Sequence, residues 1–324
     1  MLISVLLFAV GLVLLIKGGD WFVDGATGIA KRFNLPDIVV GATVVSIGTT
    51  LPEVMVSTTG ALAGSGAMAY GNAIGSIICN TALIAAISIT CNPGPVNVKS
   101  MKTPAIFFFC SAALYCFASY VLGEFPRWMG FVMLSIFVVY MVLTVRNGMK
   151  NPDASAEEEE EESKPKALWQ ELLLLVAGAA VIAVGADLLV EHGQIIALEL
   201  GVPETVVALL FVALGTSLPE LVTTITSLKK GRASLGVGNV IGANVFNLVL
   251  VSGVAVSLAP FPVPCENFLL DTGLNMSLVL EIPVMLGVMS LMIFPALATK
   301  KLGRWQGILL LAIYAAFCVC QFVL

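Results

Sequence analysis

The chain has 324 residues, of which 58% are hydrophobic and only 11% are charged. Soluble domains carry roughly 25% charged residues, and a soluble fold of this length could not cover so much apolar surface. Together with a mean hydropathy of +1.00, this composition excludes an ordinary soluble protein. It predicts that the lipid bilayer is the solvent of the chain.

Ten apolar segments, taken in chain order, are long enough to cross a bilayer as helices, which takes about 20 residues each. They cover, to within several residues, 2–19, 36–60, 68–90, 103–122, 128–146, 168–190, 203–227, 235–258, 277–297 and 305–323. The first has no basic residues before it and no clear cleavage site, so we expect a membrane span and not a signal peptide. The predicted fold class is an all-α membrane protein with ten transmembrane helices.

The basic residues divide sharply between the two sides of such a protein. Ten spans place alternate loops on opposite sides, and of the 16 Lys and Arg residues only Arg127 falls on the side of the N-terminus. Basic loops remain in the cytoplasm, so we expect both termini outside. The compact size and the lack of a large regulatory loop suggest a multi-pass protein of a prokaryotic cytoplasmic (inner) membrane.

The two halves of the chain resemble each other. Residues 18–80 align without gaps with residues 185–247, and 21 of these 63 positions are identical. Each half holds five spans, an odd number, so the second copy must cross the membrane in the opposite direction, which is typical of secondary transporters. We predict a first inverted repeat at 1–146, an acidic cytoplasmic linker at 147–166 and a second inverted repeat at 167–324.

One motif occurs at the centre of the second and of the seventh apolar segment. Residues 48–53 read Gly-Thr-Thr-Leu-Pro-Glu, and residues 215–220 read Gly-Thr-Ser-Leu-Pro-Glu. A carboxylate in the middle of a membrane span is costly and indicates function. Because Pro52 and Pro219 cannot donate a backbone hydrogen bond, we expect both helices to break there and expose carbonyl groups to a cavity.

Polar residues of the third and eighth segments complete the pattern. Asn72, Ser76 and Asn80 are spaced by four and share one helix face, as do Asn239 and Asn247. The motifs together predict an all-oxygen site with two carboxylates, which suits hard cations such as Ca²⁺ and Na⁺. They contain no thiolate or imidazole, which argues against zinc or copper. The alternative is a purely structural pair of buried glutamates, which would cost stability without a function.

At these motifs the sequence resembles the calcium/cation antiporter superfamily, in particular the microbial Na⁺/Ca²⁺ exchangers. The resemblance implies an antiporter with two inverted five-helix repeats, in which spans 1 and 6 slide as a gate. It also implies that Glu53 and Glu220 are the Ca²⁺ carboxylates. Further contacts with cations or water would come from Thr49, Thr216, Thr50, Ser217, Ser76, Asn80 and Asn247, and from the backbone carbonyls of Ser46 and Ala213.

Two residues of the second half depart from the family pattern. Ala243 replaces the hydroxyl that Ser76 provides in the first half, and Asn247 stands where some members carry Asp. With fewer oxygens and no third carboxylate, the number of Na⁺ ions stays open, and Asn247 argues against K⁺ co-transport. Outside the motifs, Asp20 and Asp187 occupy matched positions near the ends of spans 1 and 6, and an interfacial role is favoured there over a role in gating.

Several alternatives share the same residues. A Ca²⁺/H⁺ antiporter would alternate Ca²⁺ with protons on the two glutamates, and a channel would conduct without counter-ion dependence. An intramembrane enzyme is disfavoured, because no nucleophile and base accompany the glutamates. The expected partners are inorganic cations and the lipid bilayer, with no cofactor, no nucleic acid and no obligate protein partner.

Overall fold

The computed structural model describes residues 2–150, 167–200, 215–264 and 275–323. Within these residues, eight helices are long and apolar enough to cross a membrane, and a ninth candidate consists of two helices that meet at a bend of 46°. These nine correspond to nine of the ten predicted segments, so a helical membrane fold is confirmed. The remaining segment, 203–227, lies outside the described residues up to residue 214.

The helices and strands have the following bounds, with η denoting a π-helical turn. The first half contains α1 (Leu2–Phe33), α2 (Asp37–Val40), η1 (Gly41–Val45), α3 (Ser46–Thr49), α4 (Leu51–Leu62), α5 (Gly66–Cys79), η2 (Asn80–Ala85), α6 (Ala86–Cys91), β1 (Gly94–Pro95), α7 (Val98–Phe117), η3 (Ala118–Leu122), β2 (Glu124–Phe125) and α8 (Arg127–Lys150). The second half contains α9 (Leu168–Glu199), α11 (Leu218–Lys229), α12 (Ala233–Phe246), η5 (Asn247–Val251), α13 (Ser252–Leu258), β3 (Phe261–Pro262), η7 (Ser277–Glu281), α14 (Ile282–Thr299), β4 (Lys301–Leu302) and α15 (Arg304–Val323).

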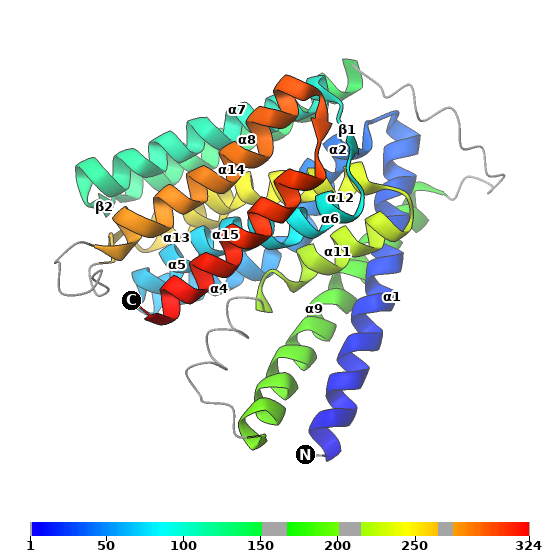
Figure 1. The fold of residues 1–324 in the computed structure, drawn as a ribbon, viewed down its shortest axis with the longest axis horizontal. Coiled ribbons are helices and arrows are strands. Elements are labelled where there is room, and N and C mark those ends of the chain that lie inside the picture. Colours follow the sequence, from blue (N-terminus) through cyan, green and yellow to red (C-terminus); the bar gives the residue numbers. More distant parts are fainter. Residues whose placement is uncertain (1, 151–166, 201–214, 265–274, 324) are drawn as a thin grey trace.

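Helices α1 and α9 lie side by side and project from the rest of the bundle (Figure 1). Their contact depends on glycine: a Cβ atom added at Gly11 would lie 2.8 Å from the Gly185 carbonyl oxygen, and one at Gly178 would lie 2.5 Å from the Phe22 nitrogen. Small residues at such a crossing let two helix backbones approach closely in a membrane. The two helices therefore form one tightly packed pair.

Helix α12 runs through the centre of the main bundle. All of its residues from Leu235 to Phe246 are buried, so this helix lies in the interior of the fold. Gly41, Gly238 and Gly242 bring the α12 backbone against α2 and η1, with no room for a side chain at any of the three positions. This crossing places the first motif segment directly beside α12 of the other half, which carries Asn239.

Contacts between the two halves occur in matched pairs. Strand β1 pairs with β4 and strand β2 pairs with β3, both antiparallel, so each short ladder joins one half to the other. Beside them, Arg304 donates from Nε to the Thr90 carbonyl oxygen at 3.0 Å, and Arg127 donates from Nη2 to the Leu258 carbonyl oxygen at 3.1 Å. In one set of contacts, β1 and Thr90 of the first half meet β4 and Arg304 of the second half. In the other set, β2 and Arg127 of the first half meet β3 and Leu258 of the second half.

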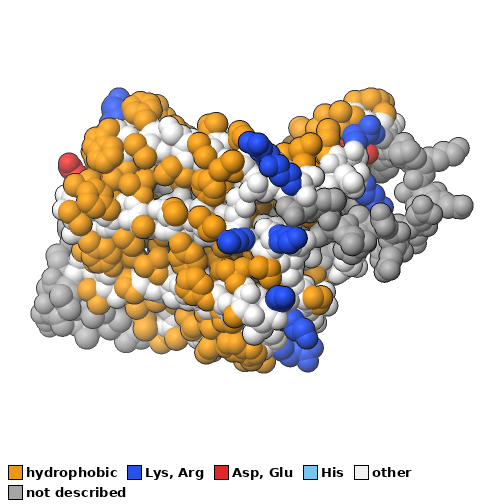
Figure 2. Space-filling view, turned by 90° about the horizontal axis from the view of Figure 1, so that it is seen from above, with side chains coloured by type: hydrophobic (Ala, Val, Ile, Leu, Met, Phe, Trp, Pro, Cys, Tyr) orange, Lys and Arg blue, Asp and Glu red, His pale blue; other side chains and the backbone are white. Residues whose placement is uncertain are grey.

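The outer surface fits a lipid environment. Large hydrophobic side chains cover much of the exposed area, while most of the Lys and Arg side chains visible in Figure 2 lie over its centre and right. Helix α8 continues to Lys150, and α1 continues to Phe33, both beyond the ends expected from hydropathy. Backbone hydrogen bonding sustains a helix beyond its apolar stretch, so hydropathy alone underestimates its length.

Candidate cation site

Both Gly-Thr-Thr/Ser-Leu-Pro-Glu motifs begin a helix at the same kind of break. Thr50 lies between α3 and α4 with φ −86° and ψ −1°, and Ser217 precedes α11 with φ −88° and ψ 1°. Pro52 and Pro219 occupy the first turn of the helix that follows, where the missing N–H group is tolerated. The predicted break is confirmed in the first motif by the 46° bend and has the same local geometry in the second.

The two glutamates of these motifs are completely buried. Glu53 and Glu220 lie in the first turns of α4 and α11, each with no exposed surface. A helix N-terminus stabilises a negative charge, because its free N–H groups point toward it. The Thr50 hydroxyl of the first motif donates to Glu220 Oε1 of the second at 3.4 Å. Carboxylates from the two halves therefore converge on one interior region.

Two asparagines connect each motif to the opposite half. The Thr49 hydroxyl donates to Asn239 Oδ1 at 3.1 Å, and the Thr216 hydroxyl donates to Asn72 Oδ1 at 3.3 Å. Asn72 also donates from Nδ2 to the Glu53 carbonyl oxygen at 3.2 Å. Both asparagines belong to the predicted polar stripe but not to the predicted cation ligands. Their identity at matched positions of the two halves was the available signal.

Ser46 holds the first motif against α12. Its hydroxyl lies 2.8 Å from the Gly41 carbonyl oxygen and 3.0 Å from the Asn239 carbonyl oxygen. Its own carbonyl oxygen accepts from the Thr50 N–H at 3.0 Å, which leaves the second lone pair of that oxygen available. The matched residue Ala213 lies outside the described residues.

Several buried polar atoms at the site have no hydrogen-bond partner within the described part of the chain. They are both Glu53 carboxylate oxygens, Glu220 Oε2, the Ser217 hydroxyl and the side-chain amides of Asn80 and Asn247. Asn80 begins η2, which packs against α11, and Asn247 begins η5, which packs against α4. Buried polar atoms without partners are rare because each costs free energy. Oxygen atoms of this kind are suitable ligands for a hard cation.

The remaining predicted residues lie in the same region. Ser76 is buried on α5, one turn before Asn80, and its match Ala243 is buried on α12. Among the described residues, no group of three or more His, Cys, Asp and Glu side chains is placed to bind a metal ion. The oxygens near the two glutamates come instead from Ser, Thr, Asn and backbone groups.

A cavity of about 1110 Å³ leads to this region between α9 and the two motifs. It reaches Gly48 and Pro52 of the first motif and Thr216 of the second, and Asp187 and Glu191 line its α9 side. The cavity therefore connects the motif segments with two further carboxylates on α9.

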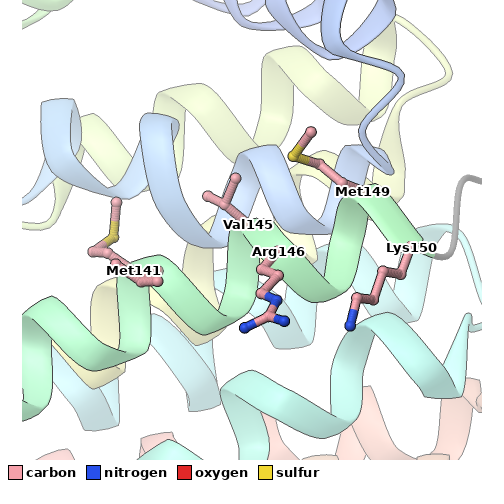
Figure 3. Close-up of a pocket in the computed structure, with 6 residues that line it drawn as sticks. Met141, Val145, Arg146, Met149 and Lys150 are labelled. Carbon is pink, nitrogen blue, oxygen red and sulfur yellow. The ribbon is translucent and has the colours of Figure 1, made fainter.

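A second hollow, of about 610 Å³, lies along α8, and neither motif lines it (Figure 3). Arg146 and Lys150 point the same way from this helix in Figure 3. The hollow is lined by Met141, Val142, Val145, Arg146, Met149 and Lys150. The side chains of these six described residues include no carboxylate or amide and carry two positive charges, so they are unsuited to binding a cation.

Comparison with known families agrees with this geometry. The sequence profile of the sodium/calcium exchanger protein family matches residues 3–146 and 171–323. This chain belongs to the sodium/calcium exchanger family. Members of this family are membrane transporters and not enzymes, and their substrates are inorganic cations.

Individual relatives of the exchanger family match nearly the whole chain. An uncharacterized membrane protein of Methanocaldococcus jannaschii is 34% identical over 95% of this chain and 94% of its own. The sodium/calcium exchanger MaX1 of Methanosarcina acetivorans is 29% identical over 99% of both chains. The structure is similar to that of the sodium-calcium exchanger NCX_Mj soaked with Na⁺ and Sr²⁺, with a TM-score of 0.80, 33% identity and 98% coverage of both chains. This exchanger family member is therefore a multi-pass integral membrane protein.

Proposed function

We propose that this protein is a secondary active antiporter that exchanges Ca²⁺ for Na⁺ by alternating access through a mid-membrane site. The observation that carries the proposal is the pair of fully buried carboxylates, Glu53 and Glu220, one from each half. Three of their four oxygens have no hydrogen-bond partner among the described residues. Two ionised carboxylates are too costly to enclose without compensating positive charge.

The charge of the site explains why the two cations exclude each other. Glu53 and Glu220 together carry two negative charges, which one Ca²⁺ or two Na⁺ ions neutralise. Both ions prefer the same oxygen ligands. Binding of either cation removes the penalty of enclosing the carboxylates, so only an occupied site changes its access. This requirement couples the entry of one ion to the exit of the other.

Other predicted ligands have roles that follow from their hydrogen bonds. The hydroxyls of Thr49 and Thr216 are engaged by Asn239 and Asn72, so in our proposal these threonines offer backbone oxygens. A larger group supplies Na⁺ or water contacts. This group comprises Thr50, Ser217, Ser76, Asn80 and Asn247 side chains and the carbonyls of Ser46 and Ala213.

The proposed transport unit consists of ten helices in two inverted repeats, 1–146 and 167–324, joined by an acidic linker at 147–166. The matched contacts between the halves, including the β1–β4 and β2–β3 pairs, support this arrangement. The distribution of Lys and Arg supports a cytoplasmic (inner) membrane location with both termini outside. In an inverted pair of repeats, exchanging the conformations of the two halves converts one access state into the other.

Transport of ⁴⁵Ca²⁺ into proteoliposomes tests the proposal. Vesicles loaded with Na⁺ and diluted into Na⁺-free buffer should take up Ca²⁺, and Glu53→Gln and Glu220→Gln should each reduce uptake to that of protein-free vesicles. Glu124→Gln is the matched control, because Glu124 is exposed in β2, and it should transport normally.

The counter-ion is decided by the same assay. Uptake driven by a pH gradient in Na⁺-free buffer, with none driven by Na⁺, would contradict Na⁺ exchange and identify a Ca²⁺/H⁺ antiporter. Normal uptake by either glutamine variant would refute the site itself.

A further inference from the structure

Lys230, in the turn between α11 and α12, contacts two carboxylate residues of α1. Its Nζ lies 2.6 Å from Asp24 Oδ1 and 3.7 Å from Asp20 Oδ1. The same nitrogen donates to the Asp20 backbone carbonyl at 3.0 Å. The Lys230 side chain is 29% exposed. One lysine thus ties α1, a member of the projecting helix pair, to a motif helix of the main bundle.

The matched position in the first half has the same backbone but no charge. Ala63 stands where the second half has Lys230. The Ala63 N–H donates to the Thr59 carbonyl oxygen at 2.9 Å, and the Lys230 N–H donates to the Thr226 carbonyl oxygen at 3.0 Å. Each is followed by a glycine with positive φ, 85° and 72°. The two turns therefore have one shape and differ in their side chain.

The acidic partners are present in both halves. Asp187 and Glu191 of α9 match Asp20 and Asp24 of α1. No described residue forms a hydrogen bond or an ion pair with the side-chain carboxylate of Asp187 or Glu191, and both residues line the cavity of about 1110 Å³. The acidic pair is therefore repeated, whereas the lysine that engages it is not.

Helix packing shows the same asymmetry. A Cβ atom added at Gly19 would lie 2.8 Å from both Val222 Cγ1 and Thr226 Oγ1, so α1 rests directly on α11. The matching residue of α9 is Ala186, which lines the cavity, and the match of Val222 is Met55, which also lines it. The α1–α9 pair is closed against the motif helix of the second half and open against that of the first.

We propose that Lys230 with Asp20 and Asp24 forms an ion-pair latch that stabilises this access state, closed at the Lys230 end and open at the α9 cavity. The inference rests on the inverted-repeat antiporter proposed above. Exchanging the conformations of the halves would close α9 onto α4 and separate α1 from α11. The latch would then be broken without replacement, because Ala63 offers no charge to Asp187 and Glu191.

Two further ion pairs among the described residues do not cross the surface between α1 and α11. Arg32 Nε lies 3.0 Å from Glu171 Oε2 and joins α1 to α9, so this contact moves with the helix pair. Arg232 Nη1 lies 3.2 Å from Asp37 Oδ2 and joins two segments of the main bundle. Only the contacts of Lys230 among these three sets cross the surface that must open. A ligand or contact shifts such an equilibrium only through its difference between the two states.

The latch is expected to bias the equilibrium modestly. Partly exposed ion pairs change equilibria by about two- to fivefold, and the Asp24 side chain is 47% exposed. In this proposal Asp20 acts in gating. Its position near the end of span 1 had favoured an interfacial role instead. Such a latch raises the population of one access state without preventing the change between the two states during transport.

The labelling rate of one cavity cysteine measures the access state. The probe is N-ethylmaleimide acting on Val190→Cys in purified protein whose native cysteines are replaced. Val190 lines the cavity on α9, and its match in α1, Val23, is fully buried, so exchanging the conformations of the halves would bury the probe position. Lys230→Ala and, separately, Asp24→Asn should slow labelling by up to about fivefold. The control is Lys229→Ala, which removes the same charge from the exposed neighbouring lysine and should label at the parent rate.

Two further variants separate a latch from a general structural role. Ala63→Lys supplies the missing lysine to Asp187 and Glu191 and should slow labelling in the same direction, by stabilising the opposite state. Lys230→Asp combined with Asp24→Lys should restore the parent rate. Parent-like labelling of monodisperse Lys230→Ala and Asp24→Asn proteins, or no effect of Ala63→Lys, would overturn the latch. Labelling does not depend on which ions are carried, so failure of ⁴⁵Ca²⁺ exchange would instead refute the proposed function.

Discussion

At the scale of single residues, the site depends on side chains that hold others in place. Asn239 accepts hydrogen bonds from the hydroxyls of Thr49 and Ser46, and Asn72 accepts one from Thr216. Neither asparagine carries charge, and each links the motif of one half to the helix of the other. They fix the backbone oxygens of the motifs relative to the two glutamates, which is the arrangement that a dehydrated cation needs.

Removing one of these asparagines tests this role. Asn239→Ala leaves the Thr49 hydroxyl without its acceptor, and loss of a buried partner costs about 1–3 kcal/mol. We expect a lowered melting temperature and an apparent Ca²⁺ affinity weakened by about tenfold. Asn97→Ala is the control, since Asn97 caps α7 away from the motifs. An unchanged affinity in Asn239→Ala would show that the asparagine does not position the site.

At the scale of elements, the helix breaks were predictable and the π-turns were not. Proline within an apolar segment has one steric consequence, so the break before Pro52 followed from the sequence. The turns η2 and η5, which begin at Asn80 and Asn247, have no comparable signal, because an i→i+5 turn depends on tertiary packing. The polar stripe of each helix was therefore predicted, but the π-helical turn that follows the helix was not.

The end of α1 shows a further limit of hydropathy. The apolar stretch ends near residue 19, yet the helix continues to Phe33 and carries Asp20 and Asp24. These carboxylates are accommodated because Lys230 lies beside them. A residue more than two hundred positions away decides this contact, so no local pattern reveals it.

The break in span 2 leads to a prediction about a single proline. Pro52→Ala restores an N–H group that can donate to the Gly48 carbonyl and favours a straight helix. We expect exchange to fall about tenfold or more while the protein remains as stable as the parent. Pro104→Ala, at the proline inside α7, makes the same change away from the motifs and should leave exchange intact. Full activity of Pro52→Ala would show that the break is dispensable.

At the scale of the whole molecule, the account requires the α1–α9 pair to move against the rest. The sequence repeat predicted two related halves, but a symmetric pattern does not indicate which side is open. The asymmetry arises from packing: α1 lies on α11, whereas the cavity lies between α9 and α4. The short ladders β1–β4 and β2–β3 join the halves away from this surface.

Cross-linking distinguishes the moving surface from the static one. A disulfide between Gly19→Cys and Val222→Cys, where the backbone of α1 touches the side chain of α11, should stop exchange until dithiothreitol restores it. A disulfide between Gly94→Cys and Leu302→Cys, opposed residues of β1 and β4, should leave exchange unaffected. Undiminished exchange with the first disulfide formed would exclude this movement.

The central claim is that Glu53 and Glu220 form one cation site from both halves of the chain. Equilibrium binding of ⁴⁵Ca²⁺ to the purified protein, with Na⁺ as competitor, tests it most directly. We predict one Ca²⁺ bound per chain, displaced competitively by Na⁺, with binding lost in Glu53→Gln and equally in Glu220→Gln. Retention of full Ca²⁺ binding by either variant would contradict a shared site.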